Sequence, residues 1–153
     1  MKYQLKNHFL STPIKLALDK VIAAVVIALT ATASVAEPFT LLSKDIAHGE
    51  FMSKKHEFNG FGCAGKDQSP QLRWINAPLG TQSFAVTVHD PDAPTGSGWW
   101  HWQIINIPTT TNDLTANTGS TKKNLAPLGS RQVANDYGVE GYGGACPPKG
   151  NGA

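Results

Sequence analysis

Residues 90–102 read DPDAPTGSGWWHW, and this stretch decides the fold because it joins two apolar segments through a short turn. Its two prolines fix their own φ angles and push the residues before them toward extended backbone. The TGSG run that follows has the composition of a tight turn. The chain therefore leaves one strand at Asp90 and enters the next near His101. We predict a pair of strands whose rim carries a carboxylate and an imidazole.

Strand patterns lie on both sides of this turn. Residues 83–90 are almost continuously apolar, which predicts a central strand largely buried on both faces. Residues 100–107 are the expected partner strand. Strict alternation along residues 99–107 places the odd-numbered side chains on one face and the even-numbered ones on the other. Residues 71–74 predict a further strand, with Leu72 and Trp74 sharing one face.

The remaining segments are shorter or more irregular. Residues 39–43 and 52–58 are strand candidates, and the polar residues 109–123 predict a long surface loop. Residues 125–133 fit no pattern, and the Gly- and Pro-rich residues 135–152 predict a loop. No helical period is sustained beyond the N-terminal segment. Short strands separated by Gly and Pro predict a mainly β domain, an antiparallel sandwich or barrel.

The N-terminal residues 1–36 have the features of a secretory signal peptide. A lysine-containing region precedes an apolar run at residues 21–29, and residues 34–36 supply small side chains for cleavage before residue 37. The alternative is an uncleaved anchor, although the run is shorter than the roughly 20 residues that span a bilayer. We therefore expect one domain at residues 37–153, in a periplasmic or secreted protein.

The charge of the mature domain is close to neutral. The whole chain has a formal net charge of +2, but four of its 13 basic and one of its 11 acidic residues lie in residues 1–36. The remainder carries a net charge of −1. This leaves no basic stripe for a nucleic-acid partner, and the composition is not that of a disordered chain.

The sequence contains two cysteines, Cys63 and Cys146. In an oxidising compartment the simplest expectation is a disulfide between them. Closing so long a loop stabilises a fold by roughly 4–5 kcal/mol in the chain-entropy model. A free thiol and a metal site remain alternatives, and the absence of C-x-x-C spacing argues against zinc.

Asp90, Asp92 and His101 form the first candidate site. They predict a polar pocket at a strand rim, where an imidazole meets a bound anion and a carboxylate orients it. The alternative is that the carboxylates cap the turn and His101 is a core histidine. A divalent cation would need further ligands, and the sequence shows none nearby, so no metal site is predicted.

Residues 142–150, YGGACPPKG, form the second candidate site. Consecutive backbone N–H groups in such a loop can surround an anion, whereas the alternative is a flexible connector. The sequence has no P-loop, dinucleotide fingerprint or H-E-x-x-H. Residues 96–98 do not have the spacing of a nucleophile elbow. We therefore expect no enzymatic activity and no cofactor.

Several motifs together resemble the phosphatidylethanolamine-binding protein (PEBP) family. They are DPDAP at 90–94, HW at 101–102, NIP at 106–108, ACPPKG at 145–150 and SPQLRW at 69–74. Within the family the chain resembles the bacterial YbhB/YbcL branch, often labelled Raf kinase inhibitor-like, and especially its exported members with two cysteines.

The resemblance implies a Greek-key β-sandwich with a small anion pocket that binds phosphate-like groups and phospholipid headgroups. Carried over by motif, the expected pocket residues are Asp90, His101, Ala145, Cys146, Pro147, Trp99 and Trp100. Among these, the acid and the histidine line the pocket, and the two residues before the proline donate backbone N–H groups. The proline shapes the wall, and the tryptophans flank the entrance.

One departure from the family pattern concerns the C-terminus. In the family the PPKG loop is followed by a second histidine and an aromatic residue, which begin a buried strand and a helical region. The present sequence stops at Ala153. We therefore expect a sandwich that is incomplete at the C-terminus and a pocket that lacks one ligand.

The expected function is that of a periplasmic PEBP-like binding protein, Raf kinase inhibitor-like, that recognises a small anionic or phosphoryl group. The alternatives are a protein-interaction or inhibitor module with a vestigial pocket, or a non-functional fragment. A hydrolase that uses Asp90 and His101 is the weakest alternative. The expected partners are a small anion and a possible protein target, without nucleic acid. Membrane contact is expected only through the signal peptide or a headgroup.

Overall fold

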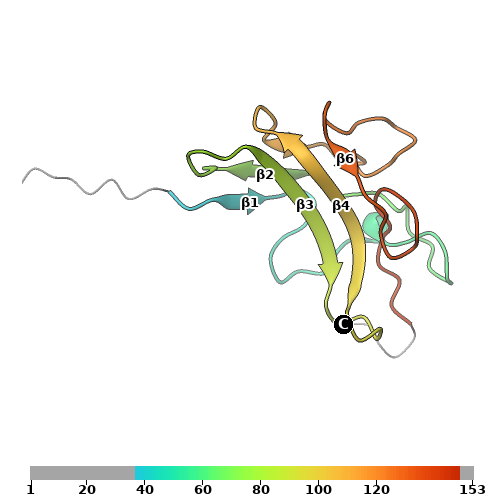
Figure 1. Cartoon of the computed structure of the whole chain (residues 1–153). Helices are drawn as coiled ribbons and strands as arrows, with labels where there is room; N and C mark the ends of the chain where they lie inside the picture. Colours follow the sequence, from blue (N-terminus) through green and yellow to red (C-terminus); the bar gives the residue numbers. More distant parts are fainter. Residues whose placement is uncertain (1–36, 149–153) are drawn as a thin grey trace, which may run out of the picture. The chain divides into compact units, whose positions relative to one another are not determined.

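The computed structural model describes residues 37–148, so the predicted signal peptide at residues 1–36 lies outside the described residues. Two three-stranded antiparallel sheets make up this part of the chain (Figure 1). The first sheet has the order β1 (Thr40–Leu42), β2 (Leu72–Ile75), β5 (Asp113–Leu114). The second has the order β3 (Ser83–Asp90), β4 (Trp99–Pro108), β6 (Arg131–Gln132). The predicted mainly β, antiparallel fold is confirmed.

The core lies where the two sheets meet. One cluster of buried side chains draws on both sheets and one loop: Leu72, Trp74, Leu114, Trp102, Ile104, Ile107 and Tyr142. Leu72 and Trp74 point inward from alternate positions of β2, as predicted. The ring of Trp74 packs on that of Phe84 from β3, with centroids 5.1 Å apart. Burial of these large apolar side chains is the main force that holds the sheets together.

β3 and β4 form the predicted hairpin, but the prediction that β3 is buried on both faces is wrong. Along β3 the residues alternate between half-buried and exposed positions, with Ala85 and Thr87 on the exposed face. Within residues 37–148, β3 pairs only with β4, on one side. Among these residues the strand therefore lies at a sheet edge, with one face exposed to solvent. A continuous apolar sequence does not require that both faces of a strand are buried.

Two irregularities in the register interrupt this hairpin. The pairing skips His101, which is an extra residue in β4, and a second bulge surrounds Asn106, whose φ is 55°. A bulge shifts the pleat by one position. His101 and Trp102 are consequently both buried, and the strict odd–even alternation predicted for residues 99–107 is wrong.

Two other expectations are also wrong. Residues 52–58 contain the short 3₁₀ turn η1 (Lys54–His56) rather than a strand, because the N–H of His56 closes a turn onto Ser53 O at 2.9 Å. Residues 109–123 are not a purely surface loop, since they contain β5 with its buried Leu114. Apolar burial at that one position overrides the polar character of the segment.

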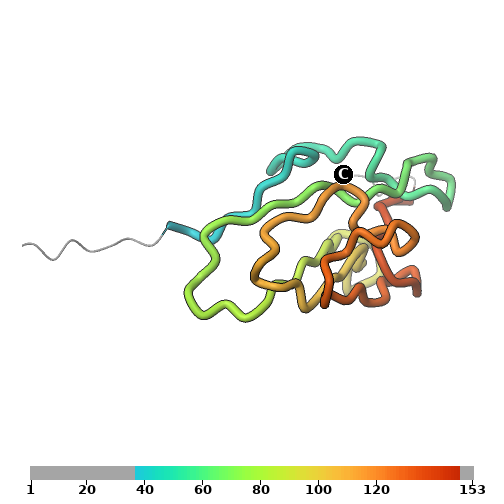
Figure 2. The backbone as a smooth tube through the Cα atoms, turned by 90° about the horizontal axis from the view of Figure 1, so that it is seen from above, coloured from blue at the N-terminus to red at the C-terminus, as the bar shows by residue number. Residues whose placement is uncertain are grey.

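The expected disulfide between Cys63 and Cys146 is present, with the two Cα atoms 5.9 Å apart. The unassigned residues 125–133 contribute β6. Residues 135–148 form the predicted loop. Figures 1 and 2 both show this segment, in red, beside the end of the β3–β4 hairpin. In the part of the chain that is described, no helix is long and apolar enough to cross a membrane.

Candidate functional site

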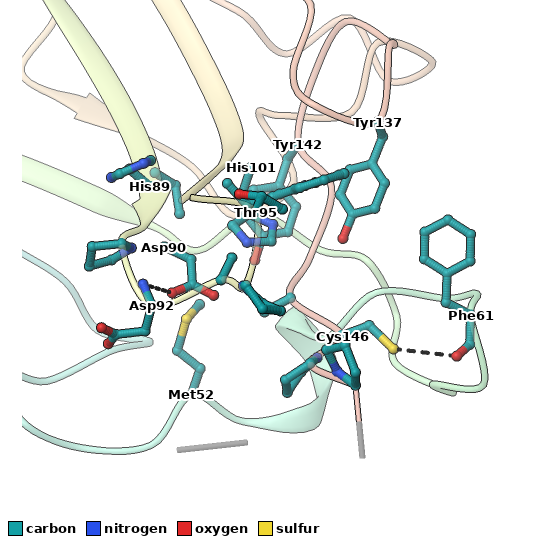
Figure 3. Close-up of a pocket in the computed structure, with 18 residues that line it drawn as sticks. Met52, Phe61, His89, Asp90, Asp92, Thr95, His101, Tyr137, Tyr142 and Cys146 are labelled. Carbon is teal, nitrogen blue, oxygen red and sulfur yellow. Dashed lines mark hydrogen bonds between the residues drawn. The ribbon is translucent and has the colours of Figure 1, made fainter. Parts of the chain in front are cut away.

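A cavity of about 800 Å³ lies between the rim of the hairpin and the loop 135–148 (Figure 3). The hairpin contributes residues 88–95, Trp99 and His101. The loop contributes Tyr137, Tyr142 and residues 145–148, and two more distant residues, Met52 and Phe61, complete the wall. Segments from four regions of the sequence therefore surround one space.

The hairpin side of the cavity is held rigid by hydrogen bonds within the turn. The N–H of Asp92 donates to Oδ1 of Asp90 at 3.0 Å, and Oγ1 of Thr95 donates to Gly98 O at 2.5 Å. Gly98 has φ 76°, and a Cβ there would lie 2.5 Å from Asp90 O, so a glycine is required. Asp90 thus does cap the turn, and it also lines the cavity.

His101 is the anchored imidazole of the cavity. Its side chain is 5% exposed, and its Nδ1 lies 2.8 Å from Gly143 O. A backbone carbonyl only accepts, so Nδ1 carries the proton. The N–H of Gly143 donates in return to His101 O at 2.9 Å. Among the described residues, the buried Nε2 has no hydrogen-bond partner.

The loop side is positioned by hydrogen bonds to its backbone. The N–H of Gly144 donates to Oδ1 of Asp67 at 2.6 Å, and Gly144 O accepts from the hydroxyl of Tyr137 at 2.7 Å. Ala145 O accepts from the N–H of Phe58 at 3.0 Å. Three consecutive peptide groups are therefore fixed, two of them by the distant residues Asp67 and Phe58 and one by Tyr137 of the same loop.

The N–H groups of Ala145 and Cys146 are the remaining donors of this segment, with no acceptor in the described part of the chain. Both residues line the cavity, and the disulfide ties Cys146 to the loop that carries Phe61. Sγ of Cys146 lies 3.8 Å from Phe61 O. A disulfide sulfur carries no proton, so this approach is a contact and not a hydrogen bond.

Aromatic side chains form part of the cavity wall between the hairpin and the loop. The ring of Tyr137 stacks on Phe58 at 4.4 Å and meets Trp99 edge-on at 5.2 Å. Burial, helped by the charge of Asp67, raises the pKa of Tyr137 to about 12. Burial also raises the pKa of Tyr142, whose hydroxyl donates to His56 O at 2.8 Å. Both phenols therefore remain neutral donors near neutral pH.

Six of the seven residues predicted from the motifs lie along the cavity: Asp90, His101, Ala145, Cys146, Pro147 and Trp99. Trp100 does not line it. The ring of Trp100 is 37% exposed and packs against His89, with centroids 4.2 Å apart. Successive side chains of a strand point to opposite faces, so Trp99 and Trp100, which are adjacent in β4, lie on opposite faces.

Tyr142 lines the cavity and is the first residue of the second candidate site, residues 142–150. Sequence reasoning missed three wall residues that lie outside both the hairpin and this segment: Met52, Phe61 and Tyr137. They carry no sequence signal for the site, because only the tertiary structure brings them to the cavity. Within residues 37–148, no group of three or more His, Cys, Asp or Glu side chains is arranged to hold a metal ion.

Comparison with known proteins places this geometry in a family. Residues 42–153 match the family described as phosphatidylethanolamine-binding protein. YbcL of Escherichia coli is 48% identical over 130 residues, which cover 85% of this chain and 71% of YbcL. YbhB of the same organism is 48% identical over 110 residues, which cover 72% of this chain and 69% of YbhB.

A solved structure and a more distant relative extend these matches. The crystal structure of E. coli YbcL, described as a member of the mammalian PEBP family, superposes with a TM-score of 0.73 at 52% identity, covering 74% of this chain and 70% of that one. LppC of Mycobacterium tuberculosis, whose name classes it as a lipoprotein, is 35% identical over 80% of this chain and 54% of LppC. The chain therefore belongs to the phosphatidylethanolamine-binding protein family, in its YbcL/YbhB branch.

Proposed function

We propose that this protein is a binding protein located outside the cytoplasm, and that its cavity recognises a small phosphoryl group joined to a cation, as in a phospholipid headgroup. The observation that carries the proposal is the state of His101. Its Nδ1 is anchored on Gly143 O, whereas its Nε2 is buried beside the cavity with no partner among residues 37–148. A buried polar atom left unpaired is costly. Because Nδ1 keeps its proton on Gly143 O, Nε2 donates only in the imidazolium form, so we propose that a phosphoryl oxygen binds to Nε2–H of that form.

The charges of the cavity favour a zwitterion over a bare anion. The N–H groups of Ala145 and Cys146 suit phosphoryl oxygens, as does Nε2–H of His101 in its imidazolium form, where both ring nitrogens donate. The carboxylate of Asp90 lines the same cavity and would repel a phosphate on its own, but it attracts an ammonium group. Phosphoethanolamine carries both charges and is therefore the probe that fits this arrangement best.

The hydrogen bonds of His101 argue for binding rather than for catalysis. In a catalytic triad, a carboxylate orients the histidine through its Nδ1–H. Here that position is taken by the carbonyl of Gly143, and Asp90 accepts from the backbone of Asp92 instead. We therefore propose that the protein is not an enzyme.

Two observations support a periplasmic or secreted location. The Cys63–Cys146 disulfide suits an oxidising compartment, and the related LppC is classed by its name as a lipoprotein. The predicted signal peptide agrees with both. Immunoblotting of periplasmic and cytoplasmic fractions tests the location, and recovery of the full chain only in the cytoplasm contradicts it.

Calorimetric titration of the full chain tests the proposed ligand. We expect phosphoethanolamine to bind more tightly than inorganic phosphate or ethanolamine, because each of these lacks one charged group. Replacing His101 with Ala should weaken phosphoethanolamine binding by at least about tenfold, the scale of one lost hydrogen bond to a charged group. The matched control is His48→Ala, since His48 is exposed and does not line the cavity.

The outcomes of the titration separate the possibilities clearly. Equal affinity of the wild-type chain and the His101→Ala variant would remove His101 from the site. Phosphate binding as tightly as phosphoethanolamine would leave the anion site in place and reject the role of Asp90.

A further inference from the structure

We propose that Asp67 is a positioning residue for the pocket and that it acts on His101 through the peptide group between Gly143 and Gly144. The inference rests on the proposed function, because it assigns His101 to ligand binding. Asp67 does not line the cavity, and its side chain reaches the site only through the backbone. Neither the pocket motifs nor the family resemblance points to this residue.

The connection is a continuous chain of hydrogen bonds. Oδ1 of Asp67 accepts from the N–H of Gly144 at 2.6 Å. The carbonyl of the same peptide group, Gly143 O, accepts from Nδ1 of His101 at 2.8 Å. The peptide group is planar and rigid, so a carboxylate that fixes its N–H end also fixes the carbonyl that holds the imidazole.

The same connection carries an electronic effect. Hydrogen bonds in a chain polarise one another, and an ionised acceptor strengthens the bond that it receives. The carboxylate of Asp67 therefore makes Gly143 O a better acceptor for His101. The bond at Nδ1 determines which ring nitrogen is left without a proton. Asp67 thus keeps Nδ1 on Gly143 O and leaves Nε2 on the side that we assign to the ligand, where it donates to a phosphoryl oxygen in the imidazolium form.

Local packing leaves the peptide group few other positions. A Cβ at Gly144 would lie 2.2 Å from His56 O, so the backbone passes through a narrow gap. The hydroxyl of Tyr137 holds Gly144 O from the other side. In a trans peptide, N–H and C=O point in opposite directions, so the N–H of Ala145 points away from Tyr137.

The backbone of Asp67 itself decides which substitutions are informative. Its φ is 51°, in the left-handed region that Gly and Asn adopt readily, and its N–H donates to Glu57 O at 2.9 Å. Asp67→Gly removes the side chain without backbone strain. Asp67→Asn keeps an oxygen acceptor at the same place. Comparison of the two variants separates the effect of losing the hydrogen bond from the effect of disturbing the backbone.

The experiment measures the full chain and its variants in two ways. Nitrogen NMR of the histidine rings, without any ligand, reports the tautomer of His101, and amide hydrogen exchange reports Gly144. Calorimetry with phosphoethanolamine reports affinity. Asp45→Ala is a control for loss of a carboxylate–amide bond together with an ion pair, since Asp45 accepts from the N–H of Gln71 at 2.7 Å and pairs with Lys55. Asp113→Asn is the control for loss of charge.

In the Asp67→Gly variant we expect mixed tautomers at His101, faster exchange at Gly144 and about tenfold weaker binding. In Asp67→Asn we expect a single tautomer and an affinity within about threefold of the wild type. The proposal is overturned if Asp67→Gly keeps one tautomer, if Asp67→Asn is impaired as severely as Asp67→Gly, or if either control reproduces the loss. If the wild-type chain binds no phosphoethanolamine, the proposed function fails, and the tautomer and exchange data still decide the role of Asp67.

Discussion

The rings of His56 and His101 share one pattern of hydrogen bonding, but their surroundings differ. Both side chains are buried, with exposures of 1% and 5%. Nδ1 of His56 lies 2.6 Å from Gln68 O, and Nδ1 of His101 lies 2.8 Å from Gly143 O. Both Nε2 atoms are buried without a partner in the described part of the chain. Only His101 lines the cavity.

This difference shows that an unpartnered ring nitrogen identifies a ligand site only where there is space for a ligand. His56 stands at the end of the turn η1 and supports the structure through its backbone, since its carbonyl accepts from the hydroxyl of Tyr142. His101 occupies a bulge in β4, where an extra residue turns an additional side chain inward. The first position supports the fold, whereas the second provides a site.

Among the variants that test the difference between His56 and His101, the largest expected effect is on the free energy of unfolding. Replacing His56 with Ala should lower the free energy of unfolding by about 2–4 kcal/mol, because it leaves a cavity and an unpaired carbonyl at Gln68. Urea denaturation measures this loss, with His48→Ala as the exposed control. Phosphoethanolamine affinity of the folded variant should stay unchanged. A stability loss below about 0.5 kcal/mol would show that His56 is not a structural anchor.

An intermediate effect is expected from replacing His101 with Asn. The side-chain amide of Asn can still donate to Gly143 O but offers nothing in place of Nε2. Affinity for phosphoethanolamine should fall about tenfold, which corresponds to ~1.4 kcal/mol, while the free energy of unfolding changes by less than about 1 kcal/mol. His56→Asn is the matched variant and should retain the wild-type affinity. Equal affinity losses in the two variants would contradict the proposal that His101, and not His56, contacts the ligand.

The smallest effect concerns Tyr137 and depends on pH. Replacing Tyr137 with Phe removes the bond to Gly144 O and should cost about 1 kcal/mol of stability at neutral pH. The phenol of Tyr137 loses its proton near pH 10 in the unfolded chain but only at about 12 in the folded chain. Its contribution is therefore complete below pH 10 and is lost as the pH rises toward 12.

Denaturation curves of the wild type and the Tyr137→Phe variant should accordingly converge in this alkaline range. Curves that stay parallel up to pH 12 would contradict the raised pKa of Tyr137. Phe58→Leu is a useful control, because it disturbs the ring stacked on Tyr137 without removing a titratable group.

The hairpin side of the site can be predicted from sequence because its information is local. Prolines and glycines in residues 90–98 set the turn, and the apolar strands on either side set the direction of the chain. These local features are enough to place Asp90 and His101 at one rim. The bulge at His101 was not predicted, since nothing in an alternating pattern marks an extra residue.

The loop side can be predicted only in part. The GGACPPKG run suggests exposed N–H groups, but their orientation depends on Asp67 and Phe58, which are distant in sequence, and on Tyr137, which lies outside the run in the same loop. Each of these contacts is a single hydrogen bond, and a pattern of apolar and polar residues does not predict individual hydrogen bonds. The same reason explains why Met52 and Phe61 were not expected in the wall.

The disulfide divides the described chain into a covalent ring and two flanking segments, residues 37–62 and 147–148. Cys63 and Cys146 are 83 residues apart, so they close a covalent ring that contains β2 to β6. β1 and His56 lie outside that ring. A single protease cut inside the ring leaves the two pieces linked, whereas a cut between residues 57 and 62 releases the piece that carries His56. Gel electrophoresis without reductant therefore distinguishes a nick inside the ring from the loss of the segment that carries Met52 and His56.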